Sequence, residues 1–287
     1  MNFKNIENMK NIIILFPVLL TMIACQKPID IKLKSSDSKT VIEAIFSSQD
    51  QNFYVMVSKN ATYFGNDSIL GINDADIVLN IGDTSLHIEK NNIQSGLYMA
   101  YLSKKYLYKT YKISVISEGK TYEARSTMPQ TVKMDSVVIK ESTGIMAFSG
   151  KNDKDSTTNF TINVYFKDPI GSNYYRIILY KNGQRLTDDP STEEQLFDDS
   201  YFKSNTTINV PLTIKCIGKE TITVEMMSID KTSYNYFTSL LTTIQSAGGS
   251  FSVPENPLSN FNNNALGYFS AYGADTISTI VPMPKKK

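Results

Sequence analysis

The sequence contains few of the residues on which common catalytic sites depend. Its 287 residues include one histidine, two cysteines and no tryptophan. Ser-His-Asp triads, Cys-His pairs and histidine-based zinc sites would all require His87. That residue lies between Leu86 and Ile88, so in a strand it would point to the opposite, solvent-facing side. We therefore expect a surface histidine and no catalytic centre of these kinds.

Nucleotide-binding and esterase fingerprints are missing too. The sequence has no phosphate-binding P-loop, no G-x-G-x-x-G motif and no Gly-x-Ser-x-Gly elbow between a strand and a helix. These absences favour a protein that is not an enzyme. A hydrolase is kept as an alternative, because paired carboxylates alone can catalyse glycoside hydrolysis.

An excess of charge of one sign is also absent. The whole chain has 29 basic and 28 acidic residues. Removal of residues 1–24, argued below, would take away two lysines and one glutamate and leave equal numbers of both signs. A nucleic-acid partner would need a concentrated basic surface, so we expect none. The three lysines at 285–287 are expected to form a solvated basic tail.

A mostly apolar run over residues 12–23 is too short to cross a bilayer but has the form of a signal peptide. About twenty apolar residues are needed to span roughly 30 Å. The run follows two lysines and ends at Ala24 and Cys25. A basic segment, a short apolar segment and a small residue before the cut make a secretory signal, so residues 1–24 are predicted to be one.

The end of this segment resembles the acceptor site of bacterial lipoproteins. Residues 22–25 are similar to the lipobox, in which the cysteine becomes the lipid-carrying first residue of the mature protein. A free thiol after ordinary cleavage, or an uncleaved N-terminal anchor, are the alternatives. Several acyl chains on Cys25, at about 0.8 kcal/mol per buried CH₂, would make release from the membrane negligible. Residues 25–39 are then a lipidated polar tether.

The second cysteine would be left without a partner for an intrachain disulfide. Cys216 has the same strand parity as four aliphatic residues between positions 208 and 214. We expect its thiol to face the core as an inert small hydrophobe rather than to act as a nucleophile.

Alternation of apolar and polar residues at period two dominates the mature chain and predicts a mainly β protein. Hairpin turns are predicted at Gly82-Asp83, Glu118-Gly119 and Asn182-Gly183, the last pair being typical of a type I′ turn. Further strands are predicted at 41–46, 53–57, 137–139, 160–166, 208–216 and 221–227.

One helix is predicted near 231–246, with Asp230 as its N-cap. Apolar residues recur there at spacings of three and four, which indicates one buried stripe. The stripe comprises Tyr234, Phe237, Leu241 and Ile244.

A domain boundary is predicted near Pro129, which follows the second hairpin and interrupts strand pairing. It divides the mature chain into a β-sandwich over 40–129 and a second β-rich domain, sandwich or barrel-like, over 130–284.

Six carboxylates gather in the polar segment 188–199. Oxygen-rich loops of this kind bind Ca²⁺, but the spacing lacks the central glycine of an EF-hand. A solvated loop, a weak calcium site and a catalytic carboxylate pair are the three interpretations, and no other cofactor is expected. The residues are Asp188, Asp189, Glu193, Glu194, Asp198 and Asp199.

Four segments in order resemble the family of bacterial outer-membrane lipoproteins called domain-of-unknown-function 4249. They run from Cys25 to Asp30, from Asp168 to Arg176, from Ser228 to Phe237 and from Asn264 to Phe269. The resemblance covers nearly the whole mature chain. It implies an Ig-like or transthyretin-like N-terminal β-sandwich followed by a second β-rich domain with one helix. Within these segments Gly267 is expected to relieve crowding in a strand.

The resemblance also implies a location and a context. Such proteins belong to the outer membrane of Bacteroidota, on its periplasmic or its cell-surface face, and are often encoded beside TonB-dependent receptors. No catalytic residues are implied, and the ligand is unknown. We expect a lipid-anchored accessory or binding protein of a nutrient uptake system, with a structural or adhesive surface module as the alternative and a carboxylate-dependent hydrolase as the minor one.

Four Asp-Ser/Thr-x tripeptides resemble the acceptor sequence for O-glycosylation in that bacterial group. Modification of Ser68 or Ser156 is the hypothesis here, because both lie in loop-like sequence. The four acceptors are Ser68, Ser136, Ser156 and Thr276.

Replacement of the anchor cysteine tests the predicted lipidation. The Cys25→Ser protein should move from the membrane pellet to the soluble fraction, because its only acylated residue is gone. Intact mass of the wild-type protein should exceed that of residues 25–287 by the mass of the lipid, and by more if sugars are attached. An unchanged membrane fraction for Cys25→Ser would contradict lipidation.

Overall fold

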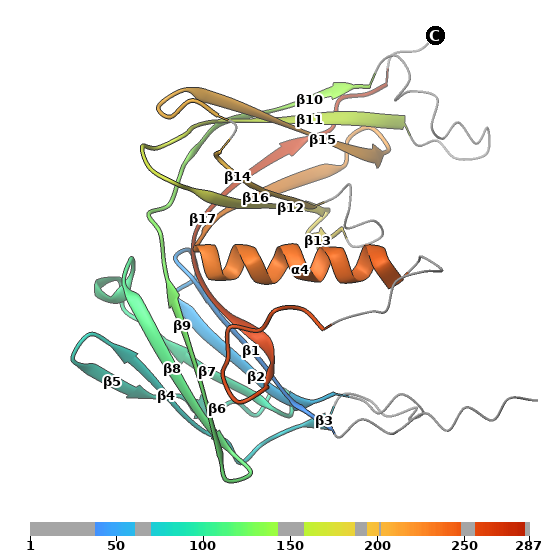
Figure 1. The fold of residues 1–287 in the computed structure, drawn as a ribbon. Helices are drawn as coiled ribbons and strands as arrows, with labels where there is room; N and C mark the ends of the chain where they lie inside the picture. Colours follow the sequence, from blue (N-terminus) through green and yellow to red (C-terminus); the bar gives the residue numbers. More distant parts are fainter. Residues whose placement is uncertain are drawn as a thin grey trace, which may run out of the picture. The chain divides into compact units, whose positions relative to one another are not determined.

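The computed structural model describes residues 38–60, 70–142, 158–186, 194–200, 202–247 and 256–284. Within these ranges the chain is mainly β, with the α-helix α4 (Lys231–Ala247) and a short 3₁₀ turn at Lys104–Tyr106. Figure 1 shows the strands in several layers, with α4 beside the long strand β17 (Leu266–Ile280). None of the described helical segments is long and apolar enough to cross a membrane.

The first core lies between two antiparallel layers. The first layer has the strand order β1-β2-β7-β6, and β3 also pairs with β2. The second layer has the order β5-β4-β8-β9. The strands of the first layer are β1 (Thr40–Ser47), β2 (Asn52–Lys59), β3 (Leu70–Gly71), β6 (Glu89–Lys90) and β7 (Leu97–Tyr101). Those of the second are β4 (Asp76–Ile81), β5 (Thr84–His87), β8 (Thr110–Ser117) and β9 (Lys120–Thr127).

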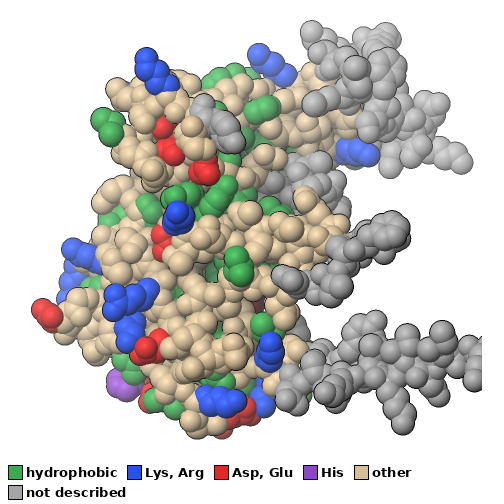
Figure 2. Space-filling model, viewed as in Figure 1, with side chains coloured by type: hydrophobic (Ala, Val, Ile, Leu, Met, Phe, Trp, Pro, Cys, Tyr) green, Lys and Arg blue, Asp and Glu red, His purple; other side chains and the backbone are tan. Residues whose placement is uncertain are grey.

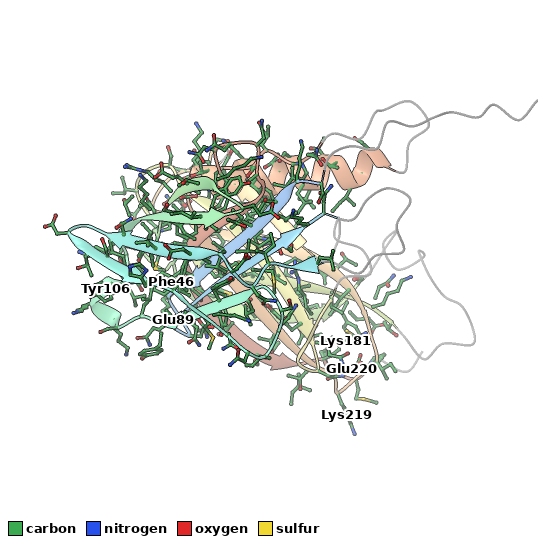
Figure 3. The ribbon with its side chains drawn as sticks, turned by 90° about the horizontal axis from the view of Figure 1, so that it is seen from below. Phe46, Glu89, Tyr106, Lys181, Lys219 and Glu220 are labelled. Atoms are coloured by element: carbon green, nitrogen blue, oxygen red, sulfur yellow. The ribbon has the colours of Figure 1, made fainter. Side chains whose placement is uncertain are left out.

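Period-two alternation explains this sandwich. Every second side chain of β1, β2, β4 and β8 is buried in the shared core, as strand geometry requires. The fully buried Phe46 meets Tyr111 edge to face, with ring centroids 5.3 Å apart, and Figure 3 places it among the packed strands. Such aromatic pairs contribute about 0.5–1.5 kcal/mol beyond their buried area.

The second core lies between a three-stranded sheet and a further part of the large sheet. Its residues come from alternate positions of the strands on both sides. The three-stranded sheet has the order β10 (Met134–Glu141), β11 (Thr158–Lys167) and β15 (Thr207–Cys216). The facing strands are β12 (Tyr174–Lys181), β13 (Gln184–Arg185), β14 (Glu194–Asp198), β16 (Thr221–Ile229) and β17.

Strand β17 belongs to both parts of the structure. Its first half pairs in parallel with β1, from Val41 opposite Leu266 to Ser47 opposite Tyr272. From Gly273 onward it pairs antiparallel with β16. The two pairings join the strands into one ten-stranded sheet, and β17 supplies Phe269 to the first core.

Gly267 makes the parallel pairing possible. Its φ is +91°, and a Cβ atom added there would lie 2.1 Å from the carbonyl oxygen of Ile42. That separation is far inside van der Waals contact, so only a residue without a side chain fits. The predicted role of Gly267 in relieving crowding is confirmed.

Helix α4 begins where Asp230 caps it. Asp230 Oδ1 accepts a hydrogen bond of 2.8 Å from the backbone N–H of Ser233. Its Oδ2 accepts bonds from the backbone N–H of Thr127, at 2.7 Å, and from Ser126 Oγ, at 2.9 Å. The predicted cap is thus confirmed, and the same carboxylate ties the start of α4 to the end of β9.

The predicted buried stripe of the helix is wrong at its C-terminal end. Phe237 is buried as expected, but Ile244 is 47% exposed and Leu241 only partly buried. Ser233 and Tyr236 are buried instead. The helix therefore packs through its first three turns on the sheet, where Tyr236 and Phe237 contact Tyr268.

The predicted secondary structure otherwise agrees with the structure. All three hairpins form at the expected turns, and Asn182 and Gly183 have φ of +52° and +83°, as a type I′ turn requires. The six further strands each lie within an observed strand. The mainly β fold with an N-terminal sandwich and one helix is confirmed, while the domain boundary at 129/130 stays a prediction.

Substitution of Gly267 tests the close approach of β1 and β17. Gly267→Ala should lower the free energy of unfolding by at least about 2 kcal/mol, because strain at positive φ adds to a backbone clash. Gly183→Ala is the matched control, since its φ is similar and nothing lies within 4 Å of the added Cβ. It should cost about 1 kcal/mol. Equal losses in urea unfolding of the two variants would contradict the proposed contact.

Candidate functional site

The residues predicted from sequence as modification or metal sites are only partly within the described structure. Cys25, Ser68, Ser156, Asp188, Asp189 and Glu193 lie outside the described residues. Glu194 begins β14, but its side chain is not described. The lipidation, the modification of these serines and the calcium hypothesis stay predictions.

The two described carboxylates of the acidic segment serve its local structure. Asp198 accepts hydrogen bonds from the backbone N–H and the hydroxyl of Ser200, and these bonds lower the pKa of its carboxyl. Asp199 Oδ2 accepts bonds of 2.9 and 3.0 Å from the backbone and side-chain nitrogens of Asn173. Among the described residues no three His, Cys, Asp or Glu side chains lie close enough to hold a metal ion.

The described Asp-Ser/Thr-x acceptors lie on strands. Ser136 is exposed on β10 beside an irregularity in the strand register. Thr276 is partly buried on β17 and accepts a hydrogen bond from Gln49 Nε2. The preceding Asp275 is engaged by Lys133 Nζ and the backbone N–H of Met134.

The single histidine and the second cysteine lie where the sequence placed them. The His87 side chain is 70% exposed and faces Asp76 across 3.5 Å. Cys216 is fully buried in the second core. Burial, followed by the nearby charge of Glu220, raises the pKa of its thiol to about 12. Figure 3 shows Glu220 with Lys181 and Lys219 at one end of the strands.

A cavity of about 220 Å³ lies between α4 and the large sheet, and we call it the α4 cavity. Five neighbouring strands, β13, β12, β16, β17 and β1, contribute side chains to it, and α4 contributes Phe237. These side chains occupy the sheet face opposite to the two main cores, because alternate residues of each strand point to opposite sides. The lining residues are Ile45, Arg176, Ile178, Tyr180, Arg185, Glu225, Met227, Phe237, Tyr268, Ser270 and Tyr272.

Arg176 is a buried cation in this cavity. Arg176 lies on β12 and is only 8% exposed. The guanidinium carbon lies 3.8 Å from the ring centroid of Phe237, which is a close cation–π contact. The helix thus packs its Phe237 ring against the guanidinium, while a second arginine, Arg185, lines the cavity from an exposed position.

Glu225 is the acidic residue among those lining the α4 cavity. Its Oε2 accepts a hydrogen bond of 2.6 Å from the hydroxyl of Tyr180. Burial and this hydrogen bond raise the pKa of Tyr180 to about 12. Burial, together with the charge of Glu225, also raises the pKa of Tyr272. Both tyrosines are therefore neutral hydroxyls at physiological pH.

Ser270 is a buried polar residue on the same sheet face. It is 1% exposed, and its hydroxyl has no hydrogen-bond partner among the described residues. An unpaired buried hydroxyl costs about 1–3 kcal/mol, so its presence in a cavity wall calls for a partner.

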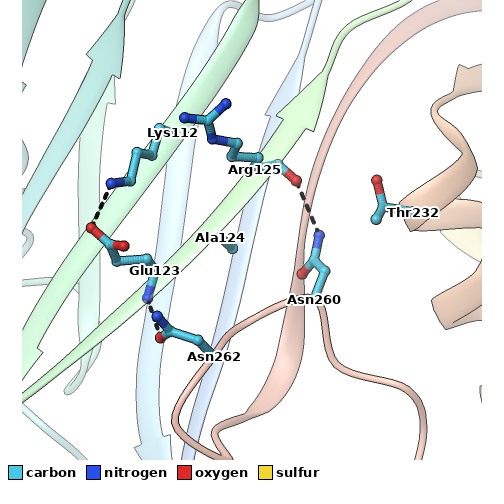
Figure 4. Close-up of a pocket in the computed structure, with 7 residues that line it drawn as sticks. All are labelled: Lys112, Glu123, Ala124, Arg125, Thr232, Asn260 and Asn262. Atoms are coloured by element: carbon cyan, nitrogen blue, oxygen red, sulfur yellow. Dashed lines mark hydrogen bonds and ion pairs between the residues drawn. The ribbon is translucent and has the colours of Figure 1, made fainter.

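A second, open groove of about 390 Å³ runs along β9, and we call it the β9 groove. Figure 4 shows its wall of Lys112, Glu123 and Arg125 opposite Asn260 and Asn262. Lys112 and Glu123 form an ion pair of 2.6 Å. The two asparagines bond to the backbone of β9 at Arg125 and Glu123, so their amides hold the loop against the strand.

The outer surface does not single out a further site. Figure 2 shows basic and acidic side chains interspersed on the face in view, with apolar side chains scattered among them. Scattered apolar residues are normal at protein surfaces, so the α4 cavity is the better candidate.

Sequence reasoning missed the α4 cavity, although one signal was present. Arg176 interrupts an otherwise apolar and aromatic strand, Tyr-Tyr-Arg-Ile-Ile-Leu-Tyr, and Glu225 similarly interrupts β16. Charged residues are almost never buried unless paired, so a charge within such a run indicates either a strand edge or a site. Arg176 and Glu225 come together only because β12 pairs with β16, and these strands are distant in the sequence.

A family model described as "Domain of unknown function (DUF4249)" matches residues 26–278. The chain belongs to the DUF4249 family. The match confirms the family resemblance, and the matched range contains the residues of both the α4 cavity and the β9 groove. No curated protein matches this DUF4249 chain. Among solved structures, the chain matches a crystal structure of chicken CNTN1 FN1-FN3 domains with 11% sequence identity and a TM-score of 0.25. The match covers 86% of this chain and 66% of the CNTN1 chain.

Alkylation of Cys216 tests its assigned burial in the DUF4249 fold. In a Cys25→Ser background Cys216 is the single thiol, and iodoacetamide at pH 8 should leave it unmodified while the protein is folded. The buried thiol, with its pKa near 12, presents neither access nor thiolate. In urea the same protein should be labelled fully. Fast labelling without denaturant would contradict the burial.

Proposed function

We propose that this protein is a non-enzymatic binding protein of the cell envelope, with the α4 cavity as its ligand site. The observation that supports this most is the combination of a partly enclosed volume with polar and charged groups beside aromatic and aliphatic side chains. Small-molecule sites in proteins have this composition. Phe237 of α4 and side chains of five strands form the walls, so the site is largely preformed.

The chemistry of the cavity favours binding over hydrolysis. A glycosidase needs two carboxylates separated by about 5–9.5 Å. Glu225 is the single carboxylate among the residues that line the α4 cavity, and its Oε2 is engaged by Tyr180. The minor alternative of a carboxylate-dependent hydrolase therefore gains no support from this site.

The proposed location is the outer membrane, with Cys25 as the lipid anchor. The lipobox-like residues 22–25 and membership of DUF4249 support this placement. We propose that the protein assists a TonB-dependent receptor in nutrient uptake, and we leave the membrane face open. The anchor would confine the binding protein to the membrane of its partner and so raise their effective concentration.

Growth of a deletion strain tests this function. Loss of the gene should slow growth on at least one nutrient, and plasmid-borne wild-type protein should restore it. Phe237→Ser should fail to restore growth, because it removes the cation–π partner of Arg176 and opens the cavity. Arg125→Gln, in the β9 groove, should restore growth and serves as the control.

Two results would count against the proposal. One is wild-type growth of the deletion strain on every nutrient, together with no TonB-dependent receptor in a pull-down from native membranes. The other is a defect in attachment or envelope integrity with normal uptake, which would favour the structural or adhesive module instead.

A further inference from the structure

We propose that the α4 cavity binds a small organic carboxylate whose body is about the size of one six-membered ring and carries a hydrogen-bond donor such as a hydroxyl. This inference rests on the proposed binding function and specifies the class of ligand. It follows from the charge, the volume and the polar groups of the cavity.

The charge of the cavity favours an anion. Two arginines and one glutamate are among its lining residues, so these residues carry one more positive than negative charge. A guanidinium has five N–H donors, so an arginine with other partners can still donate to a ligand. Its planar fork matches the two oxygens of a carboxylate, and such charge-assisted pairs are stronger than neutral hydrogen bonds.

The position of Arg176 strengthens this interpretation. The residue is 8% exposed and its guanidinium is packed on Phe237 at 3.8 Å. A guanidinium fixed in this way loses little further freedom when a ligand arrives. In the poorly solvated cavity its attraction for an anion is also larger than at the surface.

The volume limits the ligand to one ring with a short substituent. An apolar cavity of 150 Å³ is known to hold benzene. The α4 cavity, at about 220 Å³, has room for a ring and a carboxyl group and little more. The walls that would face the ring are Phe237, Tyr268 and the aliphatic Ile45, Ile178 and Met227.

The Tyr268 side chain is preorganised to pack against such a ring. Its own ring stacks on Tyr236 with centroids 4.5 Å apart and meets Phe237 edge to face at 5.1 Å. These contacts fix Tyr268 from the side of the helix. A flat ligand therefore meets a rigid aromatic wall, which lowers the entropy lost on binding.

Two polar groups explain the expected donor on the ligand. Glu225 is an acceptor and lies within the same cavity as the arginines. Ser270 has a buried hydroxyl without a partner among the described residues. A hydroxyl on the ligand can donate to Glu225 in addition to Tyr180, or pair with Ser270, whose hydroxyl an unsubstituted ring would leave unpaired.

Isothermal titration of the full mature protein in detergent with four probes tests the ligand class. 4-Hydroxybenzoate and glucuronate both have a carboxylate, a ring and a hydroxyl donor, and they distinguish an aromatic body from a sugar-like one. Benzoate lacks the donor, and phenol lacks the carboxylate. We expect saturable binding of at least one of the first two, with phenol at least tenfold weaker than 4-hydroxybenzoate if the aromatic body is accepted.

Three variants place the binding in the α4 cavity. Arg185→Gln should weaken binding of the carboxylate at least tenfold, since it removes a charged donor from an exposed position without disturbing a core. Ser270→Ala should weaken the hydroxylated probe severalfold but leave benzoate unchanged, and it should not lower the melting temperature. Arg125→Gln is the matched control, an exposed arginine on β9 in the other groove, and should bind as the wild type does.

The outcomes separate this inference from the proposed function. Binding of phenol as tight as that of 4-hydroxybenzoate, lost in Ser270→Ala, would overturn the carboxylate class and leave a binding protein for neutral ligands. No binding of any probe would overturn the class as well, while the growth test decides the function independently. An equal loss of affinity in Arg125→Gln and Arg185→Gln would overturn the assignment to the α4 cavity.

Discussion

The parallel pairing of β1 with β17 is the constraint on which the rest of the structure depends. It joins two groups of strands, each with its own core, into one ten-stranded sheet. Phe269 and Ala271 of β17 point into the first core, whereas Tyr268, Ser270 and Tyr272 stand on the opposite face and line the α4 cavity. The same seven-residue stretch thus stabilises the sandwich and builds the candidate site. Gly267 allows the close approach that this pairing requires.

The helix that closes the cavity is held by the same neighbourhood. Asp230 connects the first turn of α4 to the end of β9 through Thr127 and Ser126. Ser126 Oγ in turn accepts a hydrogen bond of 2.8 Å from the backbone N–H of Ala271 on β17. Helix, first sandwich and shared strand therefore form one hydrogen-bonded junction. A site built on such a junction has its ligand-facing groups fixed by strands and a helix rather than by loops.

Local signals in the sequence were sufficient for much of the fold. The turn at Asn182-Gly183, the cap at Asp230 and the inward parity of Cys216 each depend on residues a few positions apart, and the structure confirms all three. The burial of the helix could not be read this way, because Ile244 has the right spacing but extends past the sheet. The α4 cavity is the least local feature of all. Arg176, Glu225 and Ser270 lie far apart in sequence and meet through strand order alone.

The pairing of the first described strand with the last has a consequence for how the chain folds. Ala274 donates its backbone N–H to Ser48 Oγ across 226 residues of sequence. Contacts at such separations require a large part of the loop-closure entropy to be lost before they form, which slows folding. The large sheet also cannot be completed until β17 has been synthesised, so β1 and β16 each keep an unpaired strand edge until then. Unpaired edges of this kind can pair with other chains, so we expect folding intermediates that lack β17 to be prone to aggregation.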